Sequence, residues 1–317
     1  MIDLHLHLDG SLSKEDFIYL AQKQGVDLGK DFPSNIVVPN DCKSLEEYLM
    51  RFDLPCSLLQ DQESLRYATK SLIERLYKLN YIYAEIRFAP QLHTNKGLDE
   101  EEVIKAVVKG LKEGLEGKEG FDANIILCCM RQASFEVNVK TIEAAIKLKE
   151  EKVVAIDLAG PEAFLPSLAY QQLFDVALKG GLNVIIHAGE ACGNDSILGA
   201  LEIGAKRIGH GVHLSFDEHT LSLVKNKICF EFCPTSNLQT KSLKEYKDVP
   251  LRKFMENDIP VTINSDNMTV SNTDVYKEYK MMVKTFNLSK DEVFFLLNNS
   301  INASFISDEE KTKNKKA

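Results

Sequence analysis

The chain has 317 residues, 44% of them hydrophobic and 27% charged, and its 47 acidic residues outnumber 38 basic ones to give a net charge of −9. This composition predicts a globular protein with enough apolar residues for one large core, and the acidic balance argues against a nucleic-acid partner. The longest uninterrupted apolar run, residues 125–130, is far shorter than the roughly 18 residues that span a membrane, so we expect no membrane segment.

Short apolar runs recur along the chain with helical segments between them. The first run stands at the amino terminus, where no basic segment followed by an apolar one marks a secretory signal, so we expect the mature chain to begin at residue 1 or 2. Several runs are rich in Val, Ile and Leu, which is typical of parallel strands covered on both faces. The eight predicted strands are 2–6, 81–88, 124–130, 153–158, 183–186, 206–208, 228–232 and 260–263.

Capping residues mark several helix boundaries between these strands. Ser13 followed by Asp16 begins a predicted helix, which ends at Gly25, a residue suited to a left-handed C-terminal position. Longer helices are predicted at 62–78, 99–115, 138–149 and 167–179, because their apolar residues recur every three or four positions. Two further starts are predicted at Ser215 with Glu218 and at Ser289 with Glu292.

Alternating strands and helices without a break in composition favour a single α/β domain, a (β/α)₈ TIM barrel with extra helices, over two doubly wound domains. We expect this domain to cover residues 1–306 and the polar residues 307–317 to form a disordered tail. Residues 30–59, between the first helix and the second strand, are the predicted lid. Active sites of such barrels lie at the carboxyl ends of the strands.

The cysteines indicate the cellular compartment rather than the chemistry. There are seven, an odd number, and none stands in a C-x-x-C pair. Cys128 and Cys129 are adjacent, which suits neither a disulfide framework nor a thiolate zinc site. We therefore expect reduced thiols in the core of a cytoplasmic protein.

The histidines predict a metal site. His5 and His7 are two residues apart in a strand, so their side chains leave the same face. His187 and Asp266 follow two later strands, whose carboxyl ends meet at the same face of a barrel. Three imidazoles and one carboxylate suit zinc and leave a position for water. We expect His5, His7, His187 and Asp266 to hold one ion that activates a nucleophile.

Glu190 and His210 are predicted to act beside the metal. A turn at Gly189 would bring Glu190, three residues after His187, over the site as a proton-transfer group. His210 stands between two glycines after the strand 206–208, and the sequence leaves open whether it is a fourth histidine ligand or a base beside the ligands. The other histidines are expected to be ordinary polar or surface residues: His93, His213 and His219.

The end of the fourth strand indicates a mononuclear centre. The segment Asp157-Leu158-Ala159-Gly160-Pro161 offers neither a lysine that could be carboxylated nor a glutamate that could bridge two metals. One zinc ion per chain is therefore the simpler prediction.

In this combination and order the motifs resemble the adenosine deaminase family of the amidohydrolase superfamily, over almost the whole chain. Each motif is weak alone, and together they are specific. They are His5-Leu6-His7-Leu8-Asp9-Gly10-Ser11, Asp157-Leu158-Ala159-Gly160, His187-Ala188-Gly189-Glu190, Ile208-Gly209-His210-Gly211, Cys233-Pro234-Thr235-Ser236-Asn237 and Asn264-Ser265-Asp266.

The resemblance implies a hydrolase of purine metabolism that removes the 6-amino group of adenosine, and of 2′-deoxyadenosine, as ammonia. It implies that zinc lowers the pKa of its water to about 7 and that hydroxide adds to C6. Glu190 would deliver a proton to N1, while His210 and Asp266 would orient the hydroxide and stabilise charge. Substrate contacts are implied for His7, Asp9 (the ribose 5′-hydroxyl), Gly160 (N3 of the purine) and Asn267.

The chain departs from the family pattern in two places. Asn267 stands where mammalian members have Asp, so an amide donor would meet an unprotonated N7. The first strand also begins closer to residue 1 than is usual in the family, which predicts a less well plugged lower end of the barrel.

Several alternatives remain open from the sequence. Adenine deaminases tend to have Glu where Asp9 stands, so Asp9 favours a nucleoside, although a modified adenosine is a further possible substrate. A nucleotide is disfavoured because few basic residues lie near the motifs, namely Arg87, Lys206 and Arg207. A two-metal hydrolase on the same barrel and a binding protein without activity are the other rivals. The sequence leaves the oligomeric state open.

Overall fold

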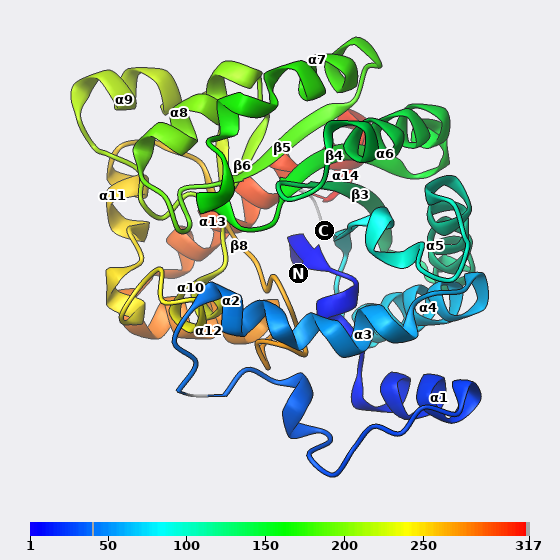
Figure 1. Cartoon of the computed structure of the whole chain (residues 1–317). Coiled ribbons are helices and arrows are strands. Elements are labelled where there is room, and N and C mark those ends of the chain that lie inside the picture. The colour runs from blue at the N-terminus through cyan, green and yellow to red at the C-terminus, as the bar shows by residue number, and fades with distance from the viewer. Residues whose placement is uncertain (40, 315–317) are drawn as a thin grey trace.

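Eight parallel strands form the centre of the structure, a computed structural model that describes residues 1–39 and 41–314. Each strand pairs with the next in chain order, and a bridge between Leu6 and Asp266 brings the end of the last strand back to the first. The strands are Ile2–His7 (β1), Tyr83–Phe88 (β2), Asp122–Met130 (β3), Val153–Ala159 (β4), Asn183–Ala188 (β5), Arg207–His210 (β6), Cys229–Phe232 (β7) and Val261–Ile263 (β8). The predicted (β/α)₈ barrel is confirmed (Figure 1).

Every predicted strand is present, with ends shifted by one or two residues in most cases. The shifts matter at the carboxyl ends, because β1 extends to His7, β5 to Ala188 and β6 to His210. Several predicted site residues thus belong to the strands themselves, where the backbone ladder fixes their position. Most strand residues are buried, as expected for strands between a filled interior and a layer of helices.

Helices surround the barrel, and most lie where the sequence predicts them. Ser13 and Asp16 form a capping box on α1, which ends at the left-handed Gly25. The longer predicted helices correspond to Gln62–Lys78 (α4), Glu100–Leu115 (α5), Phe135–Leu148 (α6) and Gln171–Lys179 (α7), and Ser289 caps Lys290–Ala303 (α13). The other helices are Lys14–Gln24 (α1), Leu45–Leu49 (α2), Asp53–Leu58 (α3), Asn194–Ile203 (α8), Glu218–Val224 (α9), Pro234–Gln239 (α10), Leu251–Glu256 (α11), Val275–Phe286 (α12) and Asp308–Asn314 (α14).

Two helix predictions need correction. Asp217, not Ser215, caps α9: its carboxylate accepts the backbone N–H of Thr220, while Ser215 donates its hydroxyl to that carboxylate at 2.6 Å. A carboxylate at this position is the stronger acceptor for the first turn of a helix. The segment Ser167–Tyr170 forms a 3₁₀ turn before α7 rather than its first turn.

The segment that we predict to be a lid runs across the cavity side of the barrel. Within residues 30–59 the chain forms α2 and α3, which lie along one side of the barrel (Figure 1). Side chains of both helices line the cavity described below, among them Leu45, Tyr48 and Cys56. Residue 40 of the segment lies outside the described residues. Its role as a lid stays a prediction.

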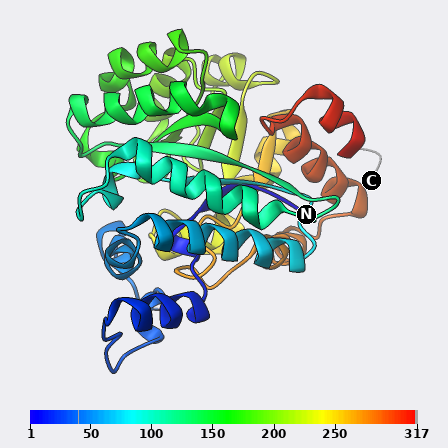
Figure 2. The same ribbon diagram turned by 90° about the vertical axis from the view of Figure 1, so that its right-hand side faces the viewer.

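The lower end of the barrel is closed by the carboxyl-terminal part of the chain. Ile301 of α13 packs against Ile2 and Leu4 of β1, and Phe305 packs against the inner residues Ile126 and Ile185. Figure 2 shows α13 and α14 on the same side of the molecule as the amino terminus. The expectation of a poorly plugged end is therefore wrong, because residues from the other end of the chain fill that space.

Residues 307–314 differ from the predicted disordered tail. Ser307 exchanges hydrogen bonds with Glu310, its hydroxyl accepting the Glu310 N–H and its own N–H reaching the Glu310 carboxylate, and α14 follows. This reciprocal cap stabilises a short helix despite the polar composition. Residues 315–317 lie outside the described residues. In the described part of the chain, no helix combines the length and apolarity needed to cross a membrane.

Candidate active site

The four predicted metal ligands meet at the carboxyl ends of the strands. The Nε2 atoms of His5 and His7 lie 3.5 and 3.4 Å from Oδ1 of Asp266, and the rings of His5 and His187 are 4.6 Å apart. Backbone hydrogen bonds hold these residues together: the N–H of Asp266 donates to the carbonyl of His5, and the backbone carbonyl of Asp266 accepts the N–H of His7. Donor atoms of His5, His7 and His187 lie within 4.8 Å of one another.

The backbone at the site is held in an uncommon conformation. His210 and Asp266 have φ angles of 62° and 59°, a left-handed region that non-glycine residues seldom adopt outside turns and functional sites. Gly209 is required for a different reason, because a Cβ there would lie 3.1 Å from the His5 ring and 3.3 Å from His187. The histidines therefore pack directly against a strand backbone.

Two buried carboxylates fix the orientation of the histidine rings. Nδ1 of His5 lies 2.8 Å from Glu231, and Nδ1 of His187 lies 3.0 Å from Asp157. A carboxylate accepts the Nδ1 proton, so Nε2 keeps its lone pair and faces the other ligands. Nε2 of His5 is fully buried and has no hydrogen-bond partner within the described structure. This bare nitrogen, in a set of imidazoles and a carboxylate, fits a zinc ion.

Arg87 of β2 joins the two carboxylates beneath the ligands. Its Nη1 lies 2.6 Å from Asp157, and its Nη2 lies 2.8 Å from Glu231. All three side chains are fully buried. Arg207 contacts the other oxygen of Glu231 at 2.6 Å, so one chain of ion pairs runs beneath the site. Sequence analysis gives Arg87 and Arg207 only as weak phosphate-binding candidates, and their burial in ion pairs excludes that use.

Burial and charge set the protonation of the ligands. Burial lowers the pKa of His5 and holds the pKa of His7 well below its usual value, which favours the neutral form that binds a metal. Burial acts in the same direction on His187, but the charge of Asp157 outweighs it and raises that pKa. Burial would raise the pKa of Asp266, yet the neighbouring imidazoles of His5, His7 and His210 hold it well below the usual range.

Glu190 turns back over the site as the sequence predicts. Gly189 has φ = 69°, and Oε2 of Glu190 lies 3.6 Å from Nε2 of His210. The turn is held by Glu162, whose carboxylate accepts four consecutive backbone N–H groups, from residues 189 to 192, at 2.6–3.0 Å. Sequence analysis misses Glu162, because no pattern near residue 162 indicates that it binds the backbone of residues 189–192. Thr240 donates its hydroxyl to Oε1 of Glu190 at 3.2 Å.

His210 is oriented from behind by Asn237. The Asn237 amide lies 3.0 Å from Nδ1 of His210 and donates to it, which places the ring proton on Nε2. A protonated Nε2 is a hydrogen-bond donor and not a metal ligand. This geometry favours a role beside the ligands over that of a fourth histidine ligand.

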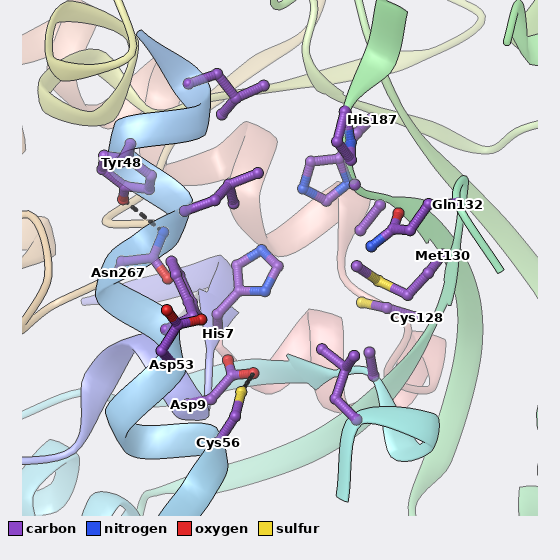
Figure 3. A pocket seen from close by; sticks show the side chains of 18 of the residues that line it. His7, Asp9, Tyr48, Asp53, Cys56, Cys128, Met130, Gln132, His187 and Asn267 are labelled. Carbon is purple, nitrogen blue, oxygen red and sulfur yellow. Dashed lines mark hydrogen bonds between the residues drawn. The ribbon is translucent and has the colours of Figure 1, made fainter. Parts of the chain in front are cut away.

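A cavity of about 860 Å³ opens above these residues. Predicted substrate contacts from several strands line it, namely His7, Asp9, Gly160 and Asn267, together with Glu190, His210 and the ligands His187 and Asp266. Figure 3 shows α2 and α3 along one side, with Tyr48 and Cys56 pointing inward, and Met130 and Gln132 on the opposite side. The volume suits a ligand of nucleoside size.

Asp9 and Asn267 have contacts that the sequence does not reveal. Burial raises the pKa of Asp9 to about 6, and the thiol of Cys56 lies 3.8 Å from its carboxylate. The Asn267 amide nitrogen donates to the hydroxyl of Tyr48 at 2.7 Å. Its oxygen is buried without a partner in the described structure, close to Gly10, where a Cβ would lie 1.8 Å from it.

The remaining histidines divide into two groups. His213 and His219 are exposed, as expected. His93 is fully buried, because it follows β2 in a 3₁₀ turn packed under α3 and places Nδ1 2.9 Å from the carbonyl of Leu59. The expectation of an ordinary polar or surface residue is wrong for His93.

Fold and site together define a TIM-barrel hydrolase of the amidohydrolase type, with a buried group of histidines and an aspartate that fits a metal. The family model described as "Adenosine deaminase" matches residues 1–315. The chain belongs to the adenosine deaminase family.

Relatives in this family match over nearly their full length. A protein named adenosine deaminase from Haemophilus ducreyi is 46% identical, with 98% of this chain and 93% of the relative covered. A relative of the same name from Clostridium perfringens is 41% identical, with 98% and 96% covered.

Among solved structures, an adenine deaminase from Arthrobacter aurescens has a TM-score of 0.90 at 25% identity, covering 99% of this chain and 96% of that one. The N6-mAMP deaminase of Arabidopsis has a TM-score of 0.88 at 27% identity, covering 98% and 95%. The fold is thus shared by enzymes whose names give different purine substrates.

Proposed function

We propose that the protein hydrolyses adenosine, and 2′-deoxyadenosine, to the corresponding inosine and ammonia. The observation that carries this proposal is the position of Glu190, whose carboxylate lines the same cavity as His7, His187 and Asp266 and lies 3.6 Å from His210. A proton-transfer group thus stands beside a metal-binding cluster in a pocket of nucleoside size. The names of the full-length relatives support the same reaction.

One zinc ion per chain is the proposed cofactor, held by His5, His7, His187 and Asp266. The lowered pKa values of His5 and His7 and the partnerless Nε2 of His5 support this ligand set. When bound, the ion supplies Lewis acidity that makes water a nucleophile near neutral pH. Glu231 and Asp157 hold two of the rings in the ligating orientation.

The surrounding side chains then have separate tasks in the proposed reaction. Glu190 protonates N1 of the purine as the nucleophile adds at C6, and the hydroxyl of Thr240 holds the carboxylate in place. His210, with its proton on Nε2, donates a hydrogen bond beside the reacting carbon. Asp266 orients the attacking water and stabilises the charge that develops. The attacking water supplies two protons: one passes through Glu190 to N1, and the other goes to the amino group, which leaves C6 as ammonia while a C6 carbonyl forms.

Substrate contacts are proposed for four residues. His7 faces the cavity beside the reacting centre, and the backbone of Gly160, at φ = 94°, meets N3. Asn267 meets N7 through its amide nitrogen. Asp9 accepts the ribose 5′-hydroxyl, which supports a nucleoside over free adenine.

The charges around the cavity support a substrate without a phosphate. Lys96 is the only lysine or arginine among its described lining residues, which include the carboxylates of Asp9, Asp53, Glu190 and Asp266. A phosphate would meet repulsion and find no arginine fork. The net charge of −9 is in line with this. All seven cysteines are free, which supports a reducing compartment such as the cytoplasm.

The test measures formation of the 6-oxopurine product by the purified, zinc-loaded protein from adenosine, 2′-deoxyadenosine, adenine, AMP and N6-methyladenosine, the last of which would release methylamine in place of ammonia. We expect turnover of the first two. Turnover of adenine alone, or of AMP alone, would disprove the nucleoside proposal. Glu190→Gln should keep one zinc per chain and lose about 10² to 10⁴-fold in kcat. Glu256→Gln, on an exposed helix position, is the matched control. Activity of Glu190→Gln near that of the control would disprove the role of Glu190.

A further inference from the structure

A second group of ligating side chains lies at one end of the cavity, apart from the four proposed metal ligands. One donor atom each from Asp9, Cys56 and His93 falls within 4.8 Å of the other two, and donor atoms of His5, His7 and His187 meet the same condition. The Cys56 thiol, on α3, points at the Asp9 carboxylate, 3.8 Å away (Figure 3). Sulfur, nitrogen and oxygen donors thus meet at one point.

The hydrogen bonding of His93 leaves its Nε2 atom free to bind a cation. Its Nδ1 lies 2.9 Å from the carbonyl oxygen of Leu59, which can only accept, so Nδ1 carries the proton and Nε2 keeps a lone pair. Nε2 is buried and has no partner in the described structure. A buried acceptor without a donor is unfavourable, and a ring held by a carbonyl at its other nitrogen is typical of a metal-ligating histidine.

Asp9 supplies negative charge without a counter-ion. Only 5% of its surface is exposed, and its carboxylate accepts hydrogen bonds from the backbone N–H of Gly10 and from the Cys56 thiol. No lysine or arginine of residues 1–39 and 41–314 forms an ion pair with it within 4.0 Å. A buried carboxylate is costly unless a charge or strong donors compensate it. A cation at this point would offset that charge and bind the bare nitrogen of His93.

We propose that Asp9, Cys56 and His93 form a second divalent-cation site, of the zinc type, that inhibits the enzyme when it is filled. Thiolate, imidazole and carboxylate are the donors that zinc prefers. On binding, the S–H bond of Cys56 breaks, its proton passes to solvent, and a sulfur–metal bond replaces the hydrogen bond to Asp9. The donors must approach the ion to about 2.0–2.3 Å. Cys56 stands on the six-residue helix α3 at the cavity wall.

Inhibition follows from the position of Asp9. The inhibitory effect rests on the proposed function, in which Asp9 accepts the ribose 5′-hydroxyl. A carboxylate bound to a cation is no longer available to the hydroxyl, so the second ion and the nucleoside compete. The first ion would thus support the reaction and the second would block the substrate.

The binding test uses the enzyme loaded with one zinc ion per chain and adds Co²⁺. We expect one further equivalent to bind and to give a thiolate-to-cobalt charge-transfer band in the near ultraviolet. Cys56→Ser should abolish the band, because a serine hydroxyl keeps a hydrogen bond to Asp9 but offers no thiolate. His93→Gln should weaken binding at least tenfold. Cys192→Ser, at a half-buried cysteine outside the cluster, is the control and should keep both. Absence of a second equivalent, or a band that persists in Cys56→Ser, would overturn the proposal.

The kinetic test compares zinc and adenosine in the same preparations. Excess zinc should raise the apparent KM for adenosine without changing kcat, and Cys56→Ser should reduce that rise at least tenfold. A second ion that binds to Cys56 but leaves KM unchanged would disprove the inhibitory role. If adenosine were not a substrate, the proposed function would fail, while the cobalt spectra would still decide whether the site exists.

Discussion

The hydroxyl of Tyr48 accepts a hydrogen bond from the amide of Asn267 at 2.7 Å, and it contacts Ser271 at 2.8 Å on its other side. Because the amide hydrogen occupies the phenol oxygen, the phenol proton goes to Ser271. The amide oxygen is turned to Gly10. Tyr48 thereby fixes the nitrogen of Asn267 as the atom available to a purine, and it does so from α2, outside the barrel strands.

Tyr48→Phe should therefore weaken adenosine binding more than it slows chemistry. Loss of one hydrogen bond of about 1 kcal/mol corresponds to an approximately fivefold rise in KM, with kcat changed less than twofold. Binding of 7-deazaadenosine, which lacks the N7 acceptor, should change little. The KM of adenosine and the inhibition constant of 7-deazaadenosine check this, and an equal loss for both would show that Tyr48 acts only through general packing.

Gly10→Ala tests the other side of the same amide. The new Cβ would stand 1.8 Å from the Asn267 oxygen, so the amide must move. We expect at least a tenfold loss in kcat/KM for adenosine with zinc retained, because the three atoms nearest to the added Cβ all belong to Asn267. Gly193→Ala, where a Cβ meets nothing within 4 Å, is the control. Unchanged kcat/KM in Gly10→Ala would argue against Asn267 as a substrate contact.

Replacement of Arg87 should lower the affinity of the proposed site for zinc. Arg87→Met leaves the buried Asp157 without its arginine and Glu231 with Arg207 alone, which costs about 3–5 kcal/mol in the free energy of unfolding. The two histidines lose their fixed orientation, so zinc affinity should fall about 10 to 100-fold in competition with a chelator. Arg87→Lys keeps the charge and should recover part of the affinity if Arg87→Met does not fold. Arg66→Met, at a half-exposed ion pair, should bind zinc like the unchanged protein.

Glu278 makes stability depend on pH. Burial raises its pKa to about 7, against an ordinary value near 4.5. The folded state therefore binds this proton more tightly than the unfolded chain, so its contribution is fully present below pH 4.5 and is lost as the pH rises through 7. Between pH 5.5 and 8.5 this amounts to about 2 kcal/mol. Glu278→Gln should lack that part of the pH dependence, as denaturant unfolding at several pH values would measure. Identical pH profiles would contradict the prediction.

The sequence predicts those parts of the fold and site that depend on residues close together in the chain. Apolar runs mark all eight strands, and the spacing of His5 and His7 places both on one face. The partners of the site residues lie far away in the chain: Glu231 is 226 residues from His5, and Tyr48 is 219 from Asn267. No local periodicity encodes such pairs. The same holds for His93, whose burial depends on α3 packing over it.

The closure of the lower end of the barrel by the carboxyl-terminal residues has a consequence for when the site can form during synthesis. Arg207, which pairs with Glu231 below His5, also donates to the carbonyl of Ala303 and stacks on the ring of Phe305. His5 leaves the ribosome among the first residues, whereas Asp266 and Phe305 leave among the last. Because synthesis runs from the amino end, one edge of β1 has no partner until the end of β8 has been made. The metal pocket can therefore form only when nearly the whole chain has been made. A nascent chain cut before residue 303 would lack the residues that close the lower end of the barrel and that contact Arg207.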